Sequence, residues 1–245
     1  FSGLLRLHLE RFPEAGEDFA GAGRYPRRRY GWMRYGAGLA RLFGSAGAHG
    51  AAAAEFEAAL DCHADAVWAR GRLAEMRLCQ HREREAFRLF HEAEAGLEGE
   101  QAKAHVRAWR GEALLWLGRF AEARKILDSA VSGGSQLAFC WRGAARLLDG
   151  DVVGGLDDLD RAIAIDPYDA EALVWRGELH RREGRDAAAA ADLETSLERR
   201  GGPWALVNLA LLSSKAGQAA KARALLARLP ASLRAGIGSV AVEMH

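Results

Sequence analysis

The chain has 245 residues, of which 34 are Lys or Arg and 33 are Asp or Glu, so its formal net charge at pH 7 is +1. This balance excludes a global electric field that would draw the protein towards nucleic acid or an anionic membrane. Hydrophobic residues make up 49% of the chain and charged residues 27%, which is typical of a folded soluble protein and excludes long disordered segments.

A repeated tripeptide indicates how the chain is organised. It occurs as Trp109-Arg110-Gly111, Trp141-Arg142-Gly143 and Trp175-Arg176-Gly177, and each glycine is followed seven residues later by a second one. The second glycines are Gly118, Gly150 and Gly184. Extending the spacing along the chain places a small residue at Gly3, Ala40, Ala74, Gly111, Gly143, Gly177 and Ala210. We expect the second glycine to mark a turn between two helices.

Two further columns continue this pattern. Twelve residues after each small residue comes another, at Ala15, Ala52, Ala86, Ala123, Gly155, Ala189 and Ala222. Four residues later comes a large apolar residue, at Phe19, Phe56, Phe90, Leu127, Leu159, Leu193 and Leu226. This spacing follows the period of an α-helix, so we expect small residues where two helices cross and a Phe or Leu that fills the seam.

The chain is therefore predicted to be all-α, with repeating pairs of helices. We expect seven units, the first of them truncated, at approximately 1-32, 33-66, 67-103, 104-135, 136-169, 170-202 and 203-230. Residues 231-245 would form a capping segment and tail. The sequence opens on Phe1-Ser2-Gly3, inside a unit and without a leader, so we expect the N-terminus to be truncated.

These columns resemble the tetratricopeptide repeat, a helix-turn-helix unit of about 34 residues. The fifth unit ends in Ile163-Ala164-Ile165-Asp166-Pro167, which is similar to the motif that closes the family's second helix. The first-helix tryptophan, however, lies two places later than in the family, and only the fifth unit has the closing proline. The resemblance implies a right-handed superhelical solenoid of antiparallel helix pairs with a concave groove.

The resemblance also implies a binding surface, because first helices line the groove in this family. The residues carried over to that surface are Arg34, Arg41, Trp68, Glu75, Leu78, His105, Glu112, Leu115, Leu147, Glu171, Glu178, Arg181 and Trp204. Trp68 and Trp204 are the favoured anchors for a partner, since large aromatic side chains often dominate interface energy. The alternative for both tryptophans is packing against the neighbouring unit.

Metal sites are disfavoured, and we expect no cofactor. Cys62 and His63 end one helix while Cys79 and His81 lie at the far end of the next, about 20 Å away at 1.5 Å per residue. Four ligands of one zinc ion must lie within about 2.3 Å of it.

The segment Asp149-Gly150-Asp151 with Asp160 partly matches a calcium-binding loop, but Val153 occupies a ligand position. The turn and the helix crossing already account for the glycines of this segment. The chain also has no phosphate-binding loop and no nucleophile elbow, so we expect no enzymatic activity.

A basic patch precedes the second unit. Arg24, Arg27, Arg28 and Arg29, continuing to Arg34, are interleaved with aromatic residues and could bind single-stranded nucleic acid. A solvated joint between units is the favoured reading, because the rest of the chain is balanced in charge.

The favoured function is a non-catalytic scaffold that binds a peptide or protein surface in its groove. The alternative is a substrate-recruiting segment of a larger enzyme or assembly, and nucleic-acid binding is less favoured. Three cysteines without tight spacing fit a reducing compartment, so we expect a cytoplasmic protein. The Arg and Glu usage fits a bacterial source, and no apolar run is long enough to span a membrane.

Overall fold

A computed structural model describes residues 11–20, 27–44, 49–62, 67–199 and 202–229, which contain α-helices and no strand. The helices are α2 (Phe12–Ala20), α3 (Arg27–Gly44), α4 (His49–Cys62), α5 (Val67–Cys79), α6 (Glu83–Ala95), α7 (Glu100–Trp116), α8 (Phe120–Ser132), α9 (Ala138–Leu148), α10 (Val152–Ile165), α11 (Ala170–Arg182), α12 (Asp186–Glu198), α13 (Pro203–Lys215) and α14 (Ala219–Ala227). The all-α prediction is confirmed. Among these helices, none is both long and apolar enough to cross a membrane.

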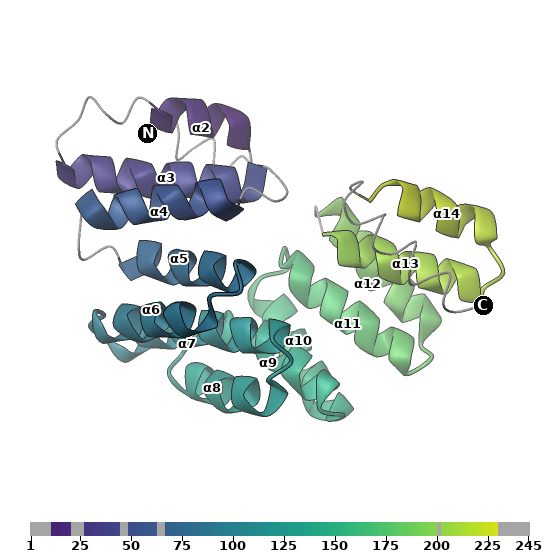
Figure 1. The fold of residues 1–245 in the computed structure, drawn as a ribbon. Coiled ribbons are helices and arrows are strands. Elements are labelled where there is room, and N and C mark those ends of the chain that lie inside the picture. The colour runs from purple at the N-terminus through teal and green to yellow at the C-terminus, as the bar shows by residue number, and fades with distance from the viewer. Residues whose placement is uncertain (1–10, 21–26, 45–48, 63–66, 200–201, 230–245) are drawn as a thin grey trace. The chain divides into compact units, whose positions relative to one another are not determined.

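The chain forms two compact bodies (Figure 1). Body 1 comprises residues 1–119 and 129–135, and body 2 comprises residues 120–128 and 136–245. Within each body every helix packs on the next one in sequence, from α2 to α7 and from α9 to α14. In addition, α5 contacts α7, α9 contacts α11 and α11 contacts α13. Within each body, first helices of successive pairs thus lie side by side, α5 with α7 in body 1 and α9, α11 and α13 in body 2. The odd-numbered helices of a body are here called its first layer, and the even-numbered helices that pack on them its second layer.

Glycine in the left-handed conformation ends the first helices, as predicted. Gly118, Gly150 and Gly184 have φ values of 71°, 86° and 73°. At Gly150 the amide of Asp151 donates to the Arg146 carbonyl at 2.8 Å, which satisfies a carbonyl at the end of α9. His81 takes the same place after α5 with a φ of 58°, so it serves as the turn residue there.

The predicted seam residues form the core. Phe56, Phe90, Leu127, Leu159 and Leu193 have no exposed surface, and the first of the column, Phe19, is 7% exposed. In the last unit, Leu225 is buried and Leu226 is partly exposed, so the core position shifts by one residue there. The repeat columns thus identified the buried stripe in both bodies.

Two of the approximate unit boundaries fall inside a helix. The boundary between 32 and 33 falls inside α3, which begins at Arg27, and the boundary between 103 and 104 falls inside α7, which begins at Glu100. Both helices carry an additional N-terminal turn that the small-residue columns do not mark. The seven-unit division stays a prediction, because residues 1–10 and the tail 231–245 lie outside the described ranges.

We expect opposite effects from alanine at two helical glycines. A Cβ at Gly143 would lie 2.7 Å from Leu159 Cγ and 3.1 Å from the Gly155 carbonyl oxygen, whereas a Cβ at Gly50 has nothing within 4 Å. Gly143→Ala should therefore lower the free energy of unfolding by about 1–3 kcal/mol through overpacking. Gly50→Ala should raise it by up to about 1 kcal/mol through helix propensity. Urea denaturation checks both, and a stabilising Gly143→Ala would contradict the crossing.

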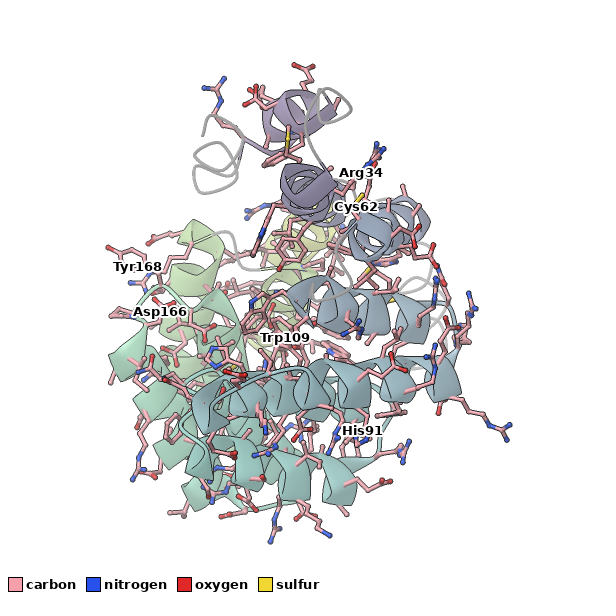
Figure 2. The ribbon with its side chains drawn as sticks, turned by 90° about the vertical axis from the view of Figure 1, so that its left-hand side faces the viewer. Arg34, Cys62, His91, Trp109, Asp166 and Tyr168 are labelled. Atoms are coloured by element: carbon pink, nitrogen blue, oxygen red, sulfur yellow. The ribbon has the colours of Figure 1, made fainter. Side chains whose placement is uncertain are left out.

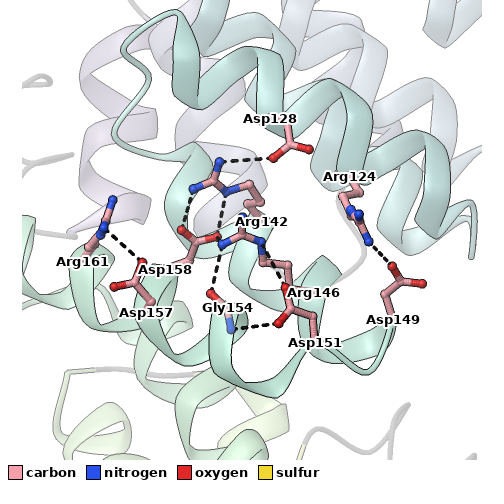
Figure 3. A network of polar contacts seen from close by, with 10 residues as sticks. All are labelled: Arg124, Asp128, Arg142, Arg146, Asp149, Asp151, Gly154, Asp157, Asp158 and Arg161. Atoms are coloured by element: carbon pink, nitrogen blue, oxygen red, sulfur yellow. Dashed lines mark hydrogen bonds and ion pairs between the residues drawn. The ribbon is translucent and has the colours of Figure 1, made fainter.

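Buried carboxylates hold the two layers together at one repeat position. Glu55, Asp158 and Asp192 each lie fifteen residues after a small crossing residue and are 9%, 0% and 7% exposed. Asp158 accepts two hydrogen bonds from Arg142, both at 2.7 Å, and one from Arg146 at 2.8 Å (Figure 3). Because charge-assisted bidentate pairs are geometrically specific, they fix how α9 lies on α10.

The arginine of the repeated tripeptide also reaches back to the preceding pair. Arg142 donates to Asp128 of α8 at 3.2 Å, and Arg176 donates to Asp160 of α10 at 2.7 Å while it holds Asp192 of α12 at 2.7 and 2.8 Å. The hydrogen bonds that Arg176 donates to Asp192 are the main cause of the raised pKa of Arg176. One arginine thus joins two successive second helices.

Candidate partner-binding face

The carried-over groove residues all belong to the layer of first helices, here called the first-helix face. In body 1 this face is built by α3, α5 and α7, and in body 2 by α9, α11 and α13. Only some of these side chains are accessible to a partner. The others are buried or form ion pairs within their own body.

A polar cluster occupies the first-helix face of body 1. The Nη1 atom of Arg72 donates to both carboxylate oxygens of Glu75, at 2.9 and 3.1 Å, and its guanidinium lies 4.5 Å from the centroid of the Trp109 ring. The positive charge of Arg72 also acts on the Tyr35 side chain of α3. Side chains from three first helices therefore meet at Arg72.

Burial shifts the acidic groups of this cluster. It raises the pKa of Glu75 despite the opposing effect of Arg72, and it raises the pKa of Tyr35. Burial and the nearby Glu75 also raise the pKa of the Cys79 thiol. A raised pKa disfavours the thiolate form of Cys79.

Trp68 packs within body 1. Its ring lies 5.6 Å from that of Trp109 in an edge-to-face arrangement, and it covers the core cluster around Phe56 and Phe90. The position of Trp109 is visible in Figure 2. This geometry favours the packing alternative for Trp68 over the anchor hypothesis.

Arg34 and Arg41 face the second helix of their own pair. Arg34 donates to Glu55 of α4 at 2.7 Å, and Arg41 lies 3.2 Å from the other oxygen of the same carboxylate. Figure 2 shows Arg34 above the end of α4. Both arginines thus already share one carboxylate inside body 1.

The remaining predicted residues of body 1 are partly or fully buried. Leu115 is 8% exposed and Leu78 packs on the core cluster. His105 and Glu112 are half-buried, and the negative charge of Glu112 acts on Arg72. Of these four, His105 and Glu112 offer polar atoms at the surface.

In body 2, an arginine pair neutralises one predicted site residue. Glu178 is 8% exposed and accepts from Arg181 at 2.7 and 2.8 Å and from Arg182 at 2.7 Å. Burial alone would raise the pKa of Glu178, but the two arginines outweigh it and the pKa is lowered. Leu147 is buried in the core of body 2. Glu178, Arg181 and Leu147 therefore stabilise body 2 itself.

The exposed part of the face lies in body 2, at the starts of its first helices and further along α13. Trp204 is 55% exposed, and Leu137 and Leu211 are 43% and 45% exposed. Glu171 is half-buried, and its pKa is raised by burial and by the neighbouring Asp169. Trp204 is thus accessible to a partner, whereas the equivalent Trp68 is packed.

The basic patch can be placed only in part. Arg24 lies outside the described residues, and Arg27, Arg28 and Arg29 form the first turn of α3, where only their backbone is described.

The candidate metal ligands belong to separate places. Cys62 and Cys79 are the last residues of α4 and α5, and His63 is outside the described ranges. Asp151 caps α10 by accepting from the Gly154 amide at 2.9 Å, and Asp149 pairs with Arg124 (Figure 3). No grouping of three or more metal-ligating side chains occurs in the part of the chain that the structure describes.

Tyr168 is an exposed aromatic residue that the repeat columns do not predict. Tyr168 is 76% exposed in the loop between α10 and α11, and the Arg199 guanidinium lies 5.0 Å from its ring centroid. Figure 2 shows Tyr168 beside Asp166 at the edge of body 2. The Asp-Pro-Tyr-Asp sequence of this loop was its only signal, since exposure does not follow from the repeat columns.

Comparison with curated proteins finds relatives of matching repeat type. The chain is 36% identical to human tetratricopeptide repeat protein 36 over 140 residues, which are 54% of this chain and 69% of the human protein. It is 35% identical to the bovine protein of the same name over 117 residues, 46% of this chain and 59% of that protein. The chain therefore spans roughly three fifths to two thirds of these relatives. They are mammalian and give no support to the bacterial source suggested by composition. No family model matches.

Solved structures show the same fold. A tetratricopeptide repeat protein from Parabacteroides merdae has a TM-score of 0.62 at 15% identity, with 93% of this chain and 89% of that chain covered. The type IV pilus biogenesis factor PilW has a TM-score of 0.59 at 18% identity, with 81% and 91% covered. A thermophilic repeat protein from Thermus thermophilus has a TM-score of 0.58 at 20% identity, with 66% and 89% covered. At these identities the likeness concerns the fold alone.

Proposed function

The chain belongs to the tetratricopeptide repeat family, and from that premise we propose that it is a non-catalytic scaffold that binds a peptide or protein surface. Proteins with this repeat commonly serve as interaction scaffolds, and the chain has the fold of that family. The binding surface is the first-helix face, which corresponds to the groove implied by the repeat.

The exposed apolar residues of body 2 carry this proposal. Trp204 and Leu211 lie seven residues apart on α13 and are each about half exposed, although the rest of that helix is largely buried. Residues seven apart lie on the same side of a helix, so the two side chains form one stripe. Exposed aromatic residues beside aliphatic ones mark interaction surfaces, and tryptophan is enriched among the residues that dominate binding energy.

Affinity capture with mass spectrometry tests the proposal. The double variant Trp204→Ala/Leu211→Ala should lose most of the partners that the wild-type chain retains, because it removes the exposed stripe. Val153→Ser is the matched control, since Val153 is 81% exposed but lies on the second helix α10. Retention of all partners by the double variant, or loss of them by the Val153 variant, would contradict the proposed face.

A further inference from the structure

Three residues at one repeat position lie along the edge where the first helices of body 2 begin. Leu137, Glu171 and Trp204 each precede the small crossing residue of their unit by six residues. Leu137 caps α9, and Glu171 and Trp204 are the second residues of α11 and α13. Since α11 contacts both α9 and α13, the acidic residue lies between the two apolar ones. This set is here called the 137/171/204 edge.

Glu171 differs from the other acidic residues of the first-helix face. Glu75 is held by Arg72 and Glu178 by Arg181 and Arg182. Within the described part of the chain, the Glu171 carboxylate has neither a hydrogen bond nor an ion pair, although the side chain is half-buried. A partly desolvated carboxylate without a partner is strongly stabilised by an added cation.

The other arginines of α11 are engaged elsewhere. Arg176, five residues after Glu171, donates to Asp160 and Asp192. Arg181 and Arg182 lie ten and eleven residues further along α11, which is about 15 Å at 1.5 Å per residue. Both are already engaged with Glu178. The neighbour Asp169 adds a second negative charge, and its side chain accepts from the Ala172 amide at 3.0 Å. Glu171 and Asp169 thus place two acidic side chains at the start of α11.

The flanking side chains suit the same ligand. The Trp204 ring is 55% exposed, and an exposed indole attracts a guanidinium or ammonium group through its π face. Leu137, 43% exposed, offers an apolar contact for the stem of such a side chain or for an adjacent apolar residue. One side of the edge thus supplies aromatic surface, the centre supplies charge and the other side supplies aliphatic surface.

We propose that the 137/171/204 edge binds an Arg or Lys side chain of a partner segment, next to a large apolar residue of the same segment. The cation pairs with Glu171 and lies over Trp204, and the apolar neighbour contacts Leu137. This specificity rests on the proposed function as a peptide-binding scaffold. It adds that the scaffold prefers segments with a basic residue next to a large apolar one.

Selection of random peptides displayed on phage tests this specificity with the full chain as bait. Peptides enriched on the wild-type chain should carry Arg or Lys beside a Leu or aromatic residue. Selection on the Glu171→Gln variant should lose the basic preference but still enrich apolar peptides. Glu198→Gln, an exposed acid on the second helix α12, is the matched control and should select the wild-type set.

Fluorescence anisotropy with the best selected peptide then measures the contribution of charge. Glu171→Gln, or citrulline in place of the peptide's Arg, should each weaken binding about tenfold, and the two changes combined should weaken it little more than either alone. Equal binding to the wild-type and Glu171→Gln chains would overturn the proposed specificity while leaving the scaffold function in place. Failure of the wild-type chain to enrich any peptide would contradict both.

Discussion

Replacing Asp158 with alanine is expected to lower the free energy of unfolding by about 3–5 kcal/mol. Asp158 is fully buried and accepts from Arg142 and Arg146 at 2.7 to 2.8 Å. Removing the carboxylate leaves two arginines without their buried partner, and the remaining contact of Arg142 with Asp128, at 3.2 Å, compensates only in part. Urea denaturation followed by circular dichroism measures the change.

Asp157 provides the control for this substitution. It lies next to Asp158 on α10 but is exposed, and it pairs with Arg161 at 3.2 Å one turn along the same helix (Figure 3). Because exposed pairs of this kind contribute about 0.3–0.5 kcal/mol, Asp157→Ala should leave the midpoint nearly unchanged. Equal effects of the two alanine variants would show that the buried carboxylate does not hold α9 on α10.

Replacing Phe56 with alanine is expected to cost a similar amount, about 3–5 kcal/mol. Phe56 has no exposed surface, and its ring fills the space beside Gly38, where a Cβ would come within 2.5 Å of it. The truncation leaves a cavity between α3 and α4 that the surrounding helices refill only in part. Thermal and urea denaturation both report the loss.

The Phe56→Leu variant distinguishes the loss of side-chain volume from the loss of the aromatic ring. The same column holds Leu127, Leu159 and Leu193 in later units, so Phe56→Leu should cost only about 1 kcal/mol. Trp116→Ala, at a site 58% exposed, should change stability by less than about 0.5 kcal/mol. A Phe56→Leu variant as unstable as Phe56→Ala would mean that the seam depends on the aromatic ring itself.

The helical framework could be predicted because its determinants repeat. The turn glycines such as Gly150 and the seam residues such as Leu159 recur at one spacing, and each has a single physical reason for its place. The buried carboxylates could not be predicted this way, since their column holds Glu55 and Asp158 in some units but Leu89 in another. A repeat position that holds acids in some units and an apolar residue in another gives no periodic signal in the sequence. In the structure, the acids at this position pair with arginines of the first helix and fix how the two helices of a pair pack.

The candidate site was predictable to a smaller extent. Trp68 and Trp204 occupy the same repeat position, but Trp68 packs on Trp109 from the next first helix. In the described residues no first helix follows α13, so Trp204 lacks such a neighbour and is exposed. Glu75 and Glu171 were both carried over to the groove, but Glu75 is paired with Arg72 and the Glu171 carboxylate has no such partner among the described residues. Whether a side chain is exposed or ion-paired depends on the residues packed around it, and the repeat position alone does not specify these residues.

Hydrogen exchange with mass spectrometry, on the full chain with and without a phage-selected peptide, tests most directly whether partners bind the first-helix face. The proposal predicts that the peptide slows deuterium uptake at the starts of α9, α11 and α13, around Leu137, Glu171 and Trp204. Slower uptake confined to the second helices α10, α12 and α14, with the first helices unchanged, would contradict it.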